Sequence, residues 1–560
     1  MCGHQFGGVR VRRTAAAPAD CRRTRQCAAA LAIAFAAVIA PARSAELLQS
    51  DGWDLRWDNT LRYTAAFRLQ HYDEALVADP NADDGDRNFA PGLISDRLDL
   101  LSELDISNGP FGIEASGAFW YDTVYHQTNS NDSPATFNPY TVPHNRFTHA
   151  TEILDGQDAD LLNAFAYGSF NLGDMPVSFR IGRHTLLWGE SLFFANNGIA
   201  AGQAPIDAIK AASEPDAEAK ELFLPVAQAS VTIQPQPDLS FAFYDQFEWR
   251  RDRLPGSGSY FSDADFLDAG GERIIVTPGQ FLYRTPDDTP SASGQFGASM
   301  HVTLDDVDYG FYALQFHAKQ PQVFAFYFPG GGDDVGAYWL KFPSYVQTFG
   351  ASFSTYAGDS TLAGEISVRH NMPLVSQSLF ALPGSSGGGY GGFAYVPQRP
   401  PQSDPAVTNE NVLAYPAGNT LHAQLSSVST LSPNAFWQGA DLSAEIAAND
   451  LLDVTAHPEL LASGRNNFAA AFRAVFEPHY YEVLPALDLS VPLGLGYDLI
   501  GKSSVDSSMN DGAGDLEIGV SATYRTVWEG SLTFTHFIGT PDRQPFGDRD
   551  FVSISIQRTF

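Results

Sequence analysis

Apolar and polar residues alternate over unusually long segments, and this is the feature that most limits what the chain can fold into. Between residues 57 and 70 (WDNTLRYTAAFRLQ), apolar side chains share one face and polar side chains share the other. This two-residue period predicts a β-strand with one apolar and one polar side. The segments 94–106 and 111–125 repeat the pattern around the tight turn Asn108-Gly109-Pro110. Such lengths exceed the mode of about five or six residues in soluble sheets and favour a large barrel.

The connections between the predicted strands alternate between short and long. We predict eighteen strands over residues 57–560, an even number. Short turns at one end and long loops at the other are typical of bacterial outer-membrane β-barrels, whereas a β-sandwich has no reason to keep that asymmetry. Because closure leaves no unpaired strand edge in lipid, we expect an all-β fold. It is a transmembrane antiparallel β-barrel of about 18 strands (16–18), with long outer loops, one of them folded inward. The short connections include 107–110, 171–176, 235–238, 305–308, 357–360 and 526–529, and the long ones include 71–93, 126–160, 185–225, 250–293, 319–344 and 372–419.

The C-terminal segment supports the same architecture. Residues 550–560 (DFVSISIQRTF) place Val552, Ile554 and Ile556 on one face, and the chain ends on Phe560. This pattern resembles the terminal strand signal that the barrel assembly machinery reads, and an ordinary edge strand ending in Phe is the alternative. We therefore expect that machinery, outer-membrane lipid and lipopolysaccharide as partners.

The N-terminus has the pattern of a targeting segment. Several arginines precede the apolar run 28–40 (AAALAIAFAAVIA), and Ala42-Arg43-Ser44 offers small residues at a cleavage site. We predict a signal peptide at residues 1–44, a periplasmic N-terminal segment at 45–56 and the outer-membrane barrel at 57–560. A short membrane anchor is the alternative, but thirteen apolar residues are too few to span a bilayer.

Composition excludes several functional classes. The chain carries 65 acidic and 33 basic residues, a net charge of −32, which argues against a nucleic-acid partner. The only cysteines are Cys2, Cys21 and Cys27, so removal of the predicted signal peptide leaves no disulfide and no cysteine-based metal or redox site. We predict no cofactor and no enzymatic activity, and a single chain indicates no oligomeric state.

Several segments resemble one family of proteobacterial outer-membrane proteins, catalogued as domain of unknown function 1302 (DUF1302). The resemblance covers essentially the whole chain after the signal peptide and implies an outer-membrane barrel without established chemistry. Members are often associated with uptake or export of hydrophobic compounds. The chain departs from the family at Ala204-Pro205, where Asn-Pro is frequent, and at Glu214-Pro215-Asp216, where Pro-Gly is common. The matching segments are RIGRHTLLWGESLFFANNGI (180–199), AP-ID (204–207), KELFLPV (220–226), FAFYDQFEW (241–249), YFSDADF (260–266), LAGEISVRHNMP (362–373), SATYRTVWEGSLTFT (521–535) and GDRDFVSISI (547–556).

The long connection 185–225 is the segment most suited to fill the lumen. A barrel of this size encloses an aqueous channel unless a chain segment narrows it. Unlike the other long loops, this one is not a spacer rich in Gly, Asp and Pro, and its stretch 208–224 could form a helix. We expect it to fold inward as a constriction, although its residues could equally serve only to pack and brace it. Candidate constriction or ligand residues are Arg180, Arg183, Trp188, Glu190, Asn197 and Asp207.

The charged side chains allow only general expectations about the solute. Arg180 and Arg183 could pair with Glu190 or with another lumen carboxylate, because charges lining a channel tune what passes. The predicted lumen face carries both signs of charge, including Glu365 and Arg369. Overall acidity favours cations or neutral solutes over anions.

Three further motifs have some features of a functional site. Asp79, Asn81 and Asp83 resemble a calcium loop, but the glycine comes one position late and no Glu closes the loop. The string around Ser386 matches a nucleophile elbow by letter only, because it lies in a glycine-rich loop. His184 could face the pore, but it has no evident catalytic partners in the sequence.

These observations lead to one principal expectation about function. The chain is expected to be an outer-membrane channel for passive passage of a small hydrophobic or amphipathic molecule. An outer-membrane barrel enzyme of the esterase or phospholipase type is one alternative. A non-conducting structural or docking barrel is the other.

Overall fold

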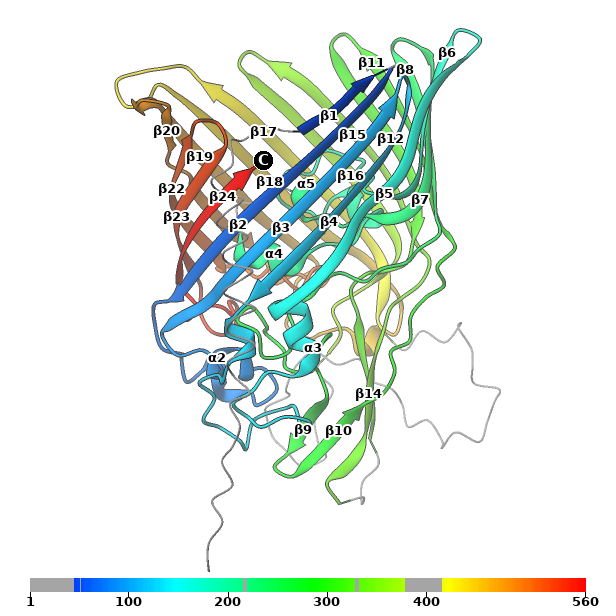
Figure 1. Ribbon diagram of the computed structural model, residues 1–560. Coiled ribbons are helices and arrows are strands. Elements are labelled where there is room, and N and C mark those ends of the chain that lie inside the picture. Colours follow the sequence, from blue (N-terminus) through cyan, green and yellow to red (C-terminus); the bar gives the residue numbers. More distant parts are fainter. Residues whose placement is uncertain (1–44, 51, 215–218, 328–331, 378–414) are drawn as a thin grey trace, which may run out of the picture. The chain divides into compact units, whose positions relative to one another are not determined.

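Long antiparallel strands form a closed barrel in the computed structural model (Figure 1). The structure describes residues 45–50, 52–214, 219–327, 332–377 and 415–560, so the predicted signal peptide lies outside the described residues. The barrel strands are β2 (Trp53–Arg68), β3 (Gly92–Asn108), β4 (Phe111–Asp122), β5 (Gln157–Leu172), β6 (Met175–His184), β7 (Val226–Gln236), β8 (Leu239–Gln246), β11 (Gln295–Leu304), β12 (Val307–Phe316), β15 (Val346–Ala357), β16 (Ser360–Pro373), β17 (Ala417–Leu431), β18 (Gly439–Ala456), β19 (Phe468–Leu484), β20 (Leu487–Ser490), β21 (Leu493–Ile500), β22 (Gly514–Tyr524), β23 (Trp528–Ile538) and β24 (Phe551–Thr559).

The barrel closes between its first and last strands. β2 pairs antiparallel with β24, from Thr60 opposite Thr559 to Arg68 opposite Phe551. β20 and β21 both lie between β19 and β22 and act as one interrupted strand, so the barrel has eighteen strand positions. The predicted transmembrane antiparallel barrel is therefore confirmed. Residues 45–50 form β1 (Ala45–Ser50), which pairs with the first residues of β2. β2 itself begins at Trp53, four residues before the predicted start at 57.

The barrel wall separates an apolar outer face from a polar inner face. Along β16, Ile366 and Val368 are exposed on the outside, whereas Glu365, Ser367 and Arg369 are buried on the inside. An outward apolar band above a polar interior is the arrangement that a lipid bilayer requires of a β-barrel. Short turns join the strands at the end where β2 begins and β24 ends, and the long loops lie at the opposite end (Figure 1).

The helices are short and belong to the long connections. None of the helices in the described part of the chain is long and apolar enough to cross a membrane. They are η1 (Leu76–Ala78), α2 (Asp84–Arg87), η2 (Val124–His126), α3 (His149–Thr151), η3 (Glu152–Gly156), η4 (Ile199–Gly202), α4 (Ala208–Ser213), α5 (Ala219–Leu222) and η6 (Pro458–Leu460).

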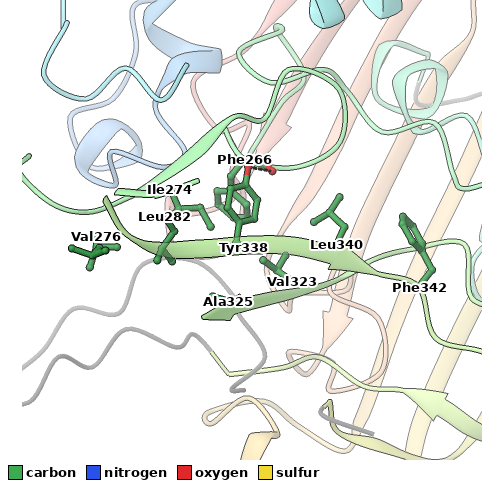
Figure 2. Close-up of a cluster of buried hydrophobic side chains, with 10 residues drawn as sticks. Phe266, Ile274, Val276, Leu282, Val323, Ala325, Tyr338, Leu340 and Phe342 are labelled. Carbon is green, nitrogen blue, oxygen red and sulfur yellow. Dashed lines mark hydrogen bonds between the residues drawn. The ribbon is translucent and has the colours of Figure 1, made fainter. Parts of the chain in front are cut away.

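A second, four-stranded sheet forms from two loops that the sequence analysis treated as spacers. β9 (Arg273–Thr277) and β10 (Gln280–Arg284) come from one loop, and β13 (Gln322–Tyr327) and β14 (Asp334–Lys341) come from the next, in the order β13-β14-β10-β9. Figure 2 shows its apolar core, in which Tyr338 also donates a hydrogen bond to the carbonyl oxygen of Phe266 at 3.0 Å. Burial of this core gives the two loops a fixed structure.

A buried ionic network joins the two strands at the closure. The Arg549 guanidinium donates two hydrogen bonds to the Asp86 carboxylate, each 2.9 Å long. Arg68, at the end of β2, contacts Asp86 at 3.0 Å and Asp548 at 3.2 Å. All four side chains are nearly inaccessible to solvent. The network thus ties the outer ends of β2 and β24 to the loop that follows β2.

Replacing Arg549 with Met should destabilise the barrel. The change leaves Asp86 buried with a single cationic partner, and removing one member of a buried ion pair costs about 3–5 kcal/mol. The measurement is urea unfolding, followed by the gel-mobility shift of the folded barrel. Arg56→Met is the control, because its 2.6 Å pair with Asp58 has an Arg side chain that is 68% exposed, and it should change stability little. Equal loss of stability in both variants would contradict the assigned role of the network.

Candidate functional site

The connection between β6 and β7 folds into the barrel, as predicted. Residues 188–203 hydrogen-bond to inward-facing side chains of β16, β17 and β18. This segment, which we call the inward loop, contains the turn η4 and leads into α4 and α5. Because it forms no strand ladder, its backbone N–H and carbonyl groups need other partners.

Glu365 on β16 supplies partners for two loop amides. Its carboxylate accepts hydrogen bonds from the backbone N–H of Glu190 at 2.5 Å and of Ile199 at 2.8 Å. Gly189 has a φ of +90°, and a Cβ there would lie 2.1 Å from Glu365 Oε2. A glycine is therefore required beside this carboxylate.

Glu445 on β18 likewise accepts hydrogen bonds from backbone amides of the loop, here those of residues 192–194. Its carboxylate accepts from the backbone N–H groups of Leu192, Phe193 and Phe194 at 2.5–3.1 Å. The Phe194 side chain packs against a cluster of small wall residues that includes Ala447. Small residues around the glutamate leave room for the loop to reach the wall.

Arg369 and Asn197 complete the attachment. The Arg369 guanidinium donates to the carbonyl oxygens of Asn196, Asn197 and Gly198 at 2.9–3.0 Å. The buried Asn197 side chain hydrogen-bonds to Gln424 at 3.2 Å and to His422 at 3.0 Å, both on β17. Asn197 is thus a bracing residue of the loop.

Trp188 packs against the wall at β8 and β12, which lie shortly before β16 in the strand order of the barrel. Its ring contacts Tyr244 on β8, with centroids 5.0 Å apart, and Tyr312 on β12. The backbone N–H of Trp188 donates to Gln203 Oε1 at 2.6 Å, which closes the loop on itself. Lys319 donates to the carbonyl oxygen of Gly202 at 3.0 Å, and burial lowers the pKa of this amine to about 8.

The four charged candidates do not gather at one point. Arg183 pairs with Glu248 at 2.8 Å, and Asp207 pairs with Arg253 at 2.8 Å while capping α4. Arg180 lies over the ring of Phe165, 5.7 Å from its centroid. Glu190 has no ion-pair partner among the described residues, and burial, followed by the charge of Asp308, raises its pKa to about 7.

The inward loop borders two cavities. The first, which we call the outer cavity, has a volume of about 400 Å³, lies toward the long outer loops and is lined by Asn196 and Ala201 of the inward loop. The second, of about 460 Å³, extends toward the short turns and is lined by Trp188 and by Arg180. Trp188 and Arg180 are therefore brought together, whereas Arg183 and Asp207 lie in separate ion pairs.

Sequence reasoning recognised the loop but missed most of its attachment points. Glu365 and Arg369 were recognised as lumen-facing, but Glu445 was not noticed. The available signal was a single glutamate at an inward position among mostly small residues (SAEIAAN, 443–449). His184 contacts Ser230 Oγ at 3.0 Å, but its other ring nitrogen faces the Gly182 carbonyl rather than a carboxylate. Ser386 and its glycine-rich loop lie outside the described residues.

A family model described as a protein of unknown function (DUF1302) matches residues 25–560. The chain belongs to this family. No curated protein matches the sequence.

Several solved structures, among them that of the outer membrane protein OpdK, are distantly similar to this DUF1302 chain. Acinetobacter baumannii OccAB3 matches with 9% identity and a TM-score of 0.42, over 90% of this chain and 99% of that one. OccAB1 from the same organism matches with 9% identity and a TM-score of 0.41, over 90% and 96%. Pseudomonas aeruginosa OpdK, solved with vanillate, matches with 11% identity and a TM-score of 0.36, over 90% and 98%. Similarity at this level bears on neither substrate nor mechanism.

Replacing either wall glutamate with Ala should loosen a different part of the inward loop. Each buried amide left without a partner costs about 1–3 kcal/mol. Glu365→Ala should speed hydrogen exchange at the amides of Glu190 and Ile199, and Glu445→Ala should do so at residues 192–194. Hydrogen-exchange mass spectrometry in detergent measures both effects. Glu103→Ala on β3 is the matched lumen control and should leave the loop unchanged, so a uniform effect in all three variants would contradict the assignment.

Proposed function

We propose that this DUF1302 protein is an outer-membrane channel for the passive passage of a small hydrophobic or amphipathic molecule. The observation that carries the proposal is the position of the inward loop between two cavities of the barrel. Asn196 and Ala201 of the loop line the outer cavity, and Trp188 of the loop lines the second cavity. A solute crossing the barrel would therefore pass this loop, which acts as the constriction.

The outer cavity has the chemistry expected for an amphipathic solute. Apolar lining comes from Phe266, Phe316 and Leu374, among others. Cationic lining comes from Arg369 and Arg465. Its volume falls within the range of about 300–1,000 Å³ that is typical of small-molecule sites.

Carboxylates also line the outer cavity and offset the attraction of its arginines for anions. Asp252 and Asp506 line it together with the cationic groups. Asp252 accepts a hydrogen bond from the backbone N–H of Ile206 at 2.8 Å, and burial raises its pKa to about 6. The mixture of signs favours a solute with one polar end over a strongly charged one.

Releasing the inward loop should increase conductance. We expect the purified full chain to give small single-channel currents in a planar bilayer. Glu365→Gln/Glu445→Gln and a deletion of residues 190–215 should both give larger currents, because the loop no longer fills the lumen. Glu103→Gln is the control and should behave like the parent protein.

The same recordings identify the solute and test the alternatives. Candidate solutes that enter the outer cavity should block the current of the parent protein and lose potency when Arg465, which lines the cavity without contacting the inward loop, is replaced by Met. Absence of current in every variant would overturn the channel proposal and favour a non-conducting docking barrel. Labelling of Ser230 by a serine-reactive probe would instead favour a barrel enzyme.

A further inference from the structure

Three buried aspartates meet where two outer loops touch. Asp83 and Asp84 lie at the start of α2, and Asp265 comes from the loop between β8 and β11. One carboxylate oxygen from each lies within 4.8 Å of the others, and all three residues are completely buried. Gly85 allows this approach, because a Cβ there would lie 2.4 Å from the carbonyl oxygen of Ser262.

Two carboxylate oxygens in this aspartate cluster accept no hydrogen bond. Asp84 is satisfied by the Asn131 side chain at 3.0 Å and the Asn138 backbone N–H at 3.2 Å. Asp83 uses Oδ2 for Arg87 at 2.5 Å, and Asp265 uses Oδ2 for the Asp84 backbone N–H at 3.1 Å. Oδ1 of Asp83 and Oδ1 of Asp265 are buried without a partner. Two unpartnered buried acceptors in one carboxylate cluster need a physical explanation, and a bound cation supplies one.

The balance of buried charges around the aspartate cluster also favours a bound cation. Arg87 forms an ion pair with Asp83 and offsets one of the three negative charges. The neighbouring network of Arg68, Arg549, Asp86 and Asp548 holds two charges of each sign and is neutral by itself. When all three carboxylates are ionised, two negative charges therefore remain uncompensated in a buried position, which is costly without a counter-ion.

Protonation is the only other way to relieve this charge. Burial raises the pKa of Asp84 and of Asp265 well above its usual value, and the neighbouring carboxylates raise it further. Burial also raises the pKa of Asp83 to about 6. A bound cation would keep all three groups ionised at neutral pH.

We propose that Asp83, Asp84 and Asp265 bind a divalent cation, with Ca²⁺ as the ion that the all-oxygen donor set favours. The site differs from the weak calcium candidate Asp79, Asn81 and Asp83 of the sequence, with which it shares only Asp83. The Asn81 side chain is not available to a cation, since it both donates a hydrogen bond to and accepts one from the backbone of Ile275 on β9. Asp79 accepts from the Asn81 backbone N–H at 2.9 Å. A cation held by the aspartate cluster would fasten the loop after β2 to the loop between β8 and β11.

The test uses the full chain in detergent after removal of metals with EDTA. Calcium chloride is titrated calorimetrically, and the thermal unfolding temperature is measured with and without Ca²⁺. The parent protein should bind one Ca²⁺ per chain and unfold at a higher temperature in its presence. Asp265→Asn should weaken binding by about tenfold or more, the scale of loss that changes around metal sites produce.

The sign of the change without metal separates a cation site from a purely structural cluster. In EDTA, Asp265→Asn should unfold at the same or a higher temperature than the parent, because it removes one of the repelling charges. Asp79→Asn is the matched control from the same loop and should bind Ca²⁺ like the parent. Absence of a Ca²⁺-dependent shift in the parent would overturn the proposal. So would loss of binding in Asp79→Asn with binding retained in Asp265→Asn.

Discussion

An irregular chain segment inside a β-barrel has no neighbouring strand to satisfy its backbone, and this constraint governs the centre of the molecule. Ionisable side chains on the wall strands β16 and β18 supply the hydrogen-bond partners that the loop backbone needs. Glu365 and Glu445 accept from five loop amides in total, and Arg369 donates to three consecutive carbonyl oxygens. Charge-assisted bonds of this kind are stronger than neutral ones, so a few residues hold the inward loop in place.

The same physics operates at the outer end of the barrel with a different balance of charge. Around Asp86 the positive and negative groups match, and the result is a neutral clasp across the closure of β2 and β24. Around Asp83 and Asp265 they do not match, and the excess is negative. The first cluster fastens a loop to the strand ends at the closure, and the second lies between two loops.

The sequence predicted the barrel far better than the attachments within it. Most strands lie within a few residues of their expected positions, because lipid and lumen enforce a period of two along each of them. The outer sheet was missed because β9 (RIIVT) and β10 (QFLYR) are only five residues long and lie inside loops. Trp188 and Asn197 were recognised from their motif, but Glu445 was not, since its partners lie about 250 residues away along the chain.

The sequence by itself determined the antiparallel barrel, the alternation of short turns with long loops, and the identity of the loop that turns inward. These properties follow from local periodicity and composition. Only the tertiary structure decided that Glu365 and Glu445 hold the loop, and that Asp86 meets Arg549 463 positions away. Such residues come together only when the barrel closes between its first and last strands. A local sequence pattern therefore cannot predict these contacts.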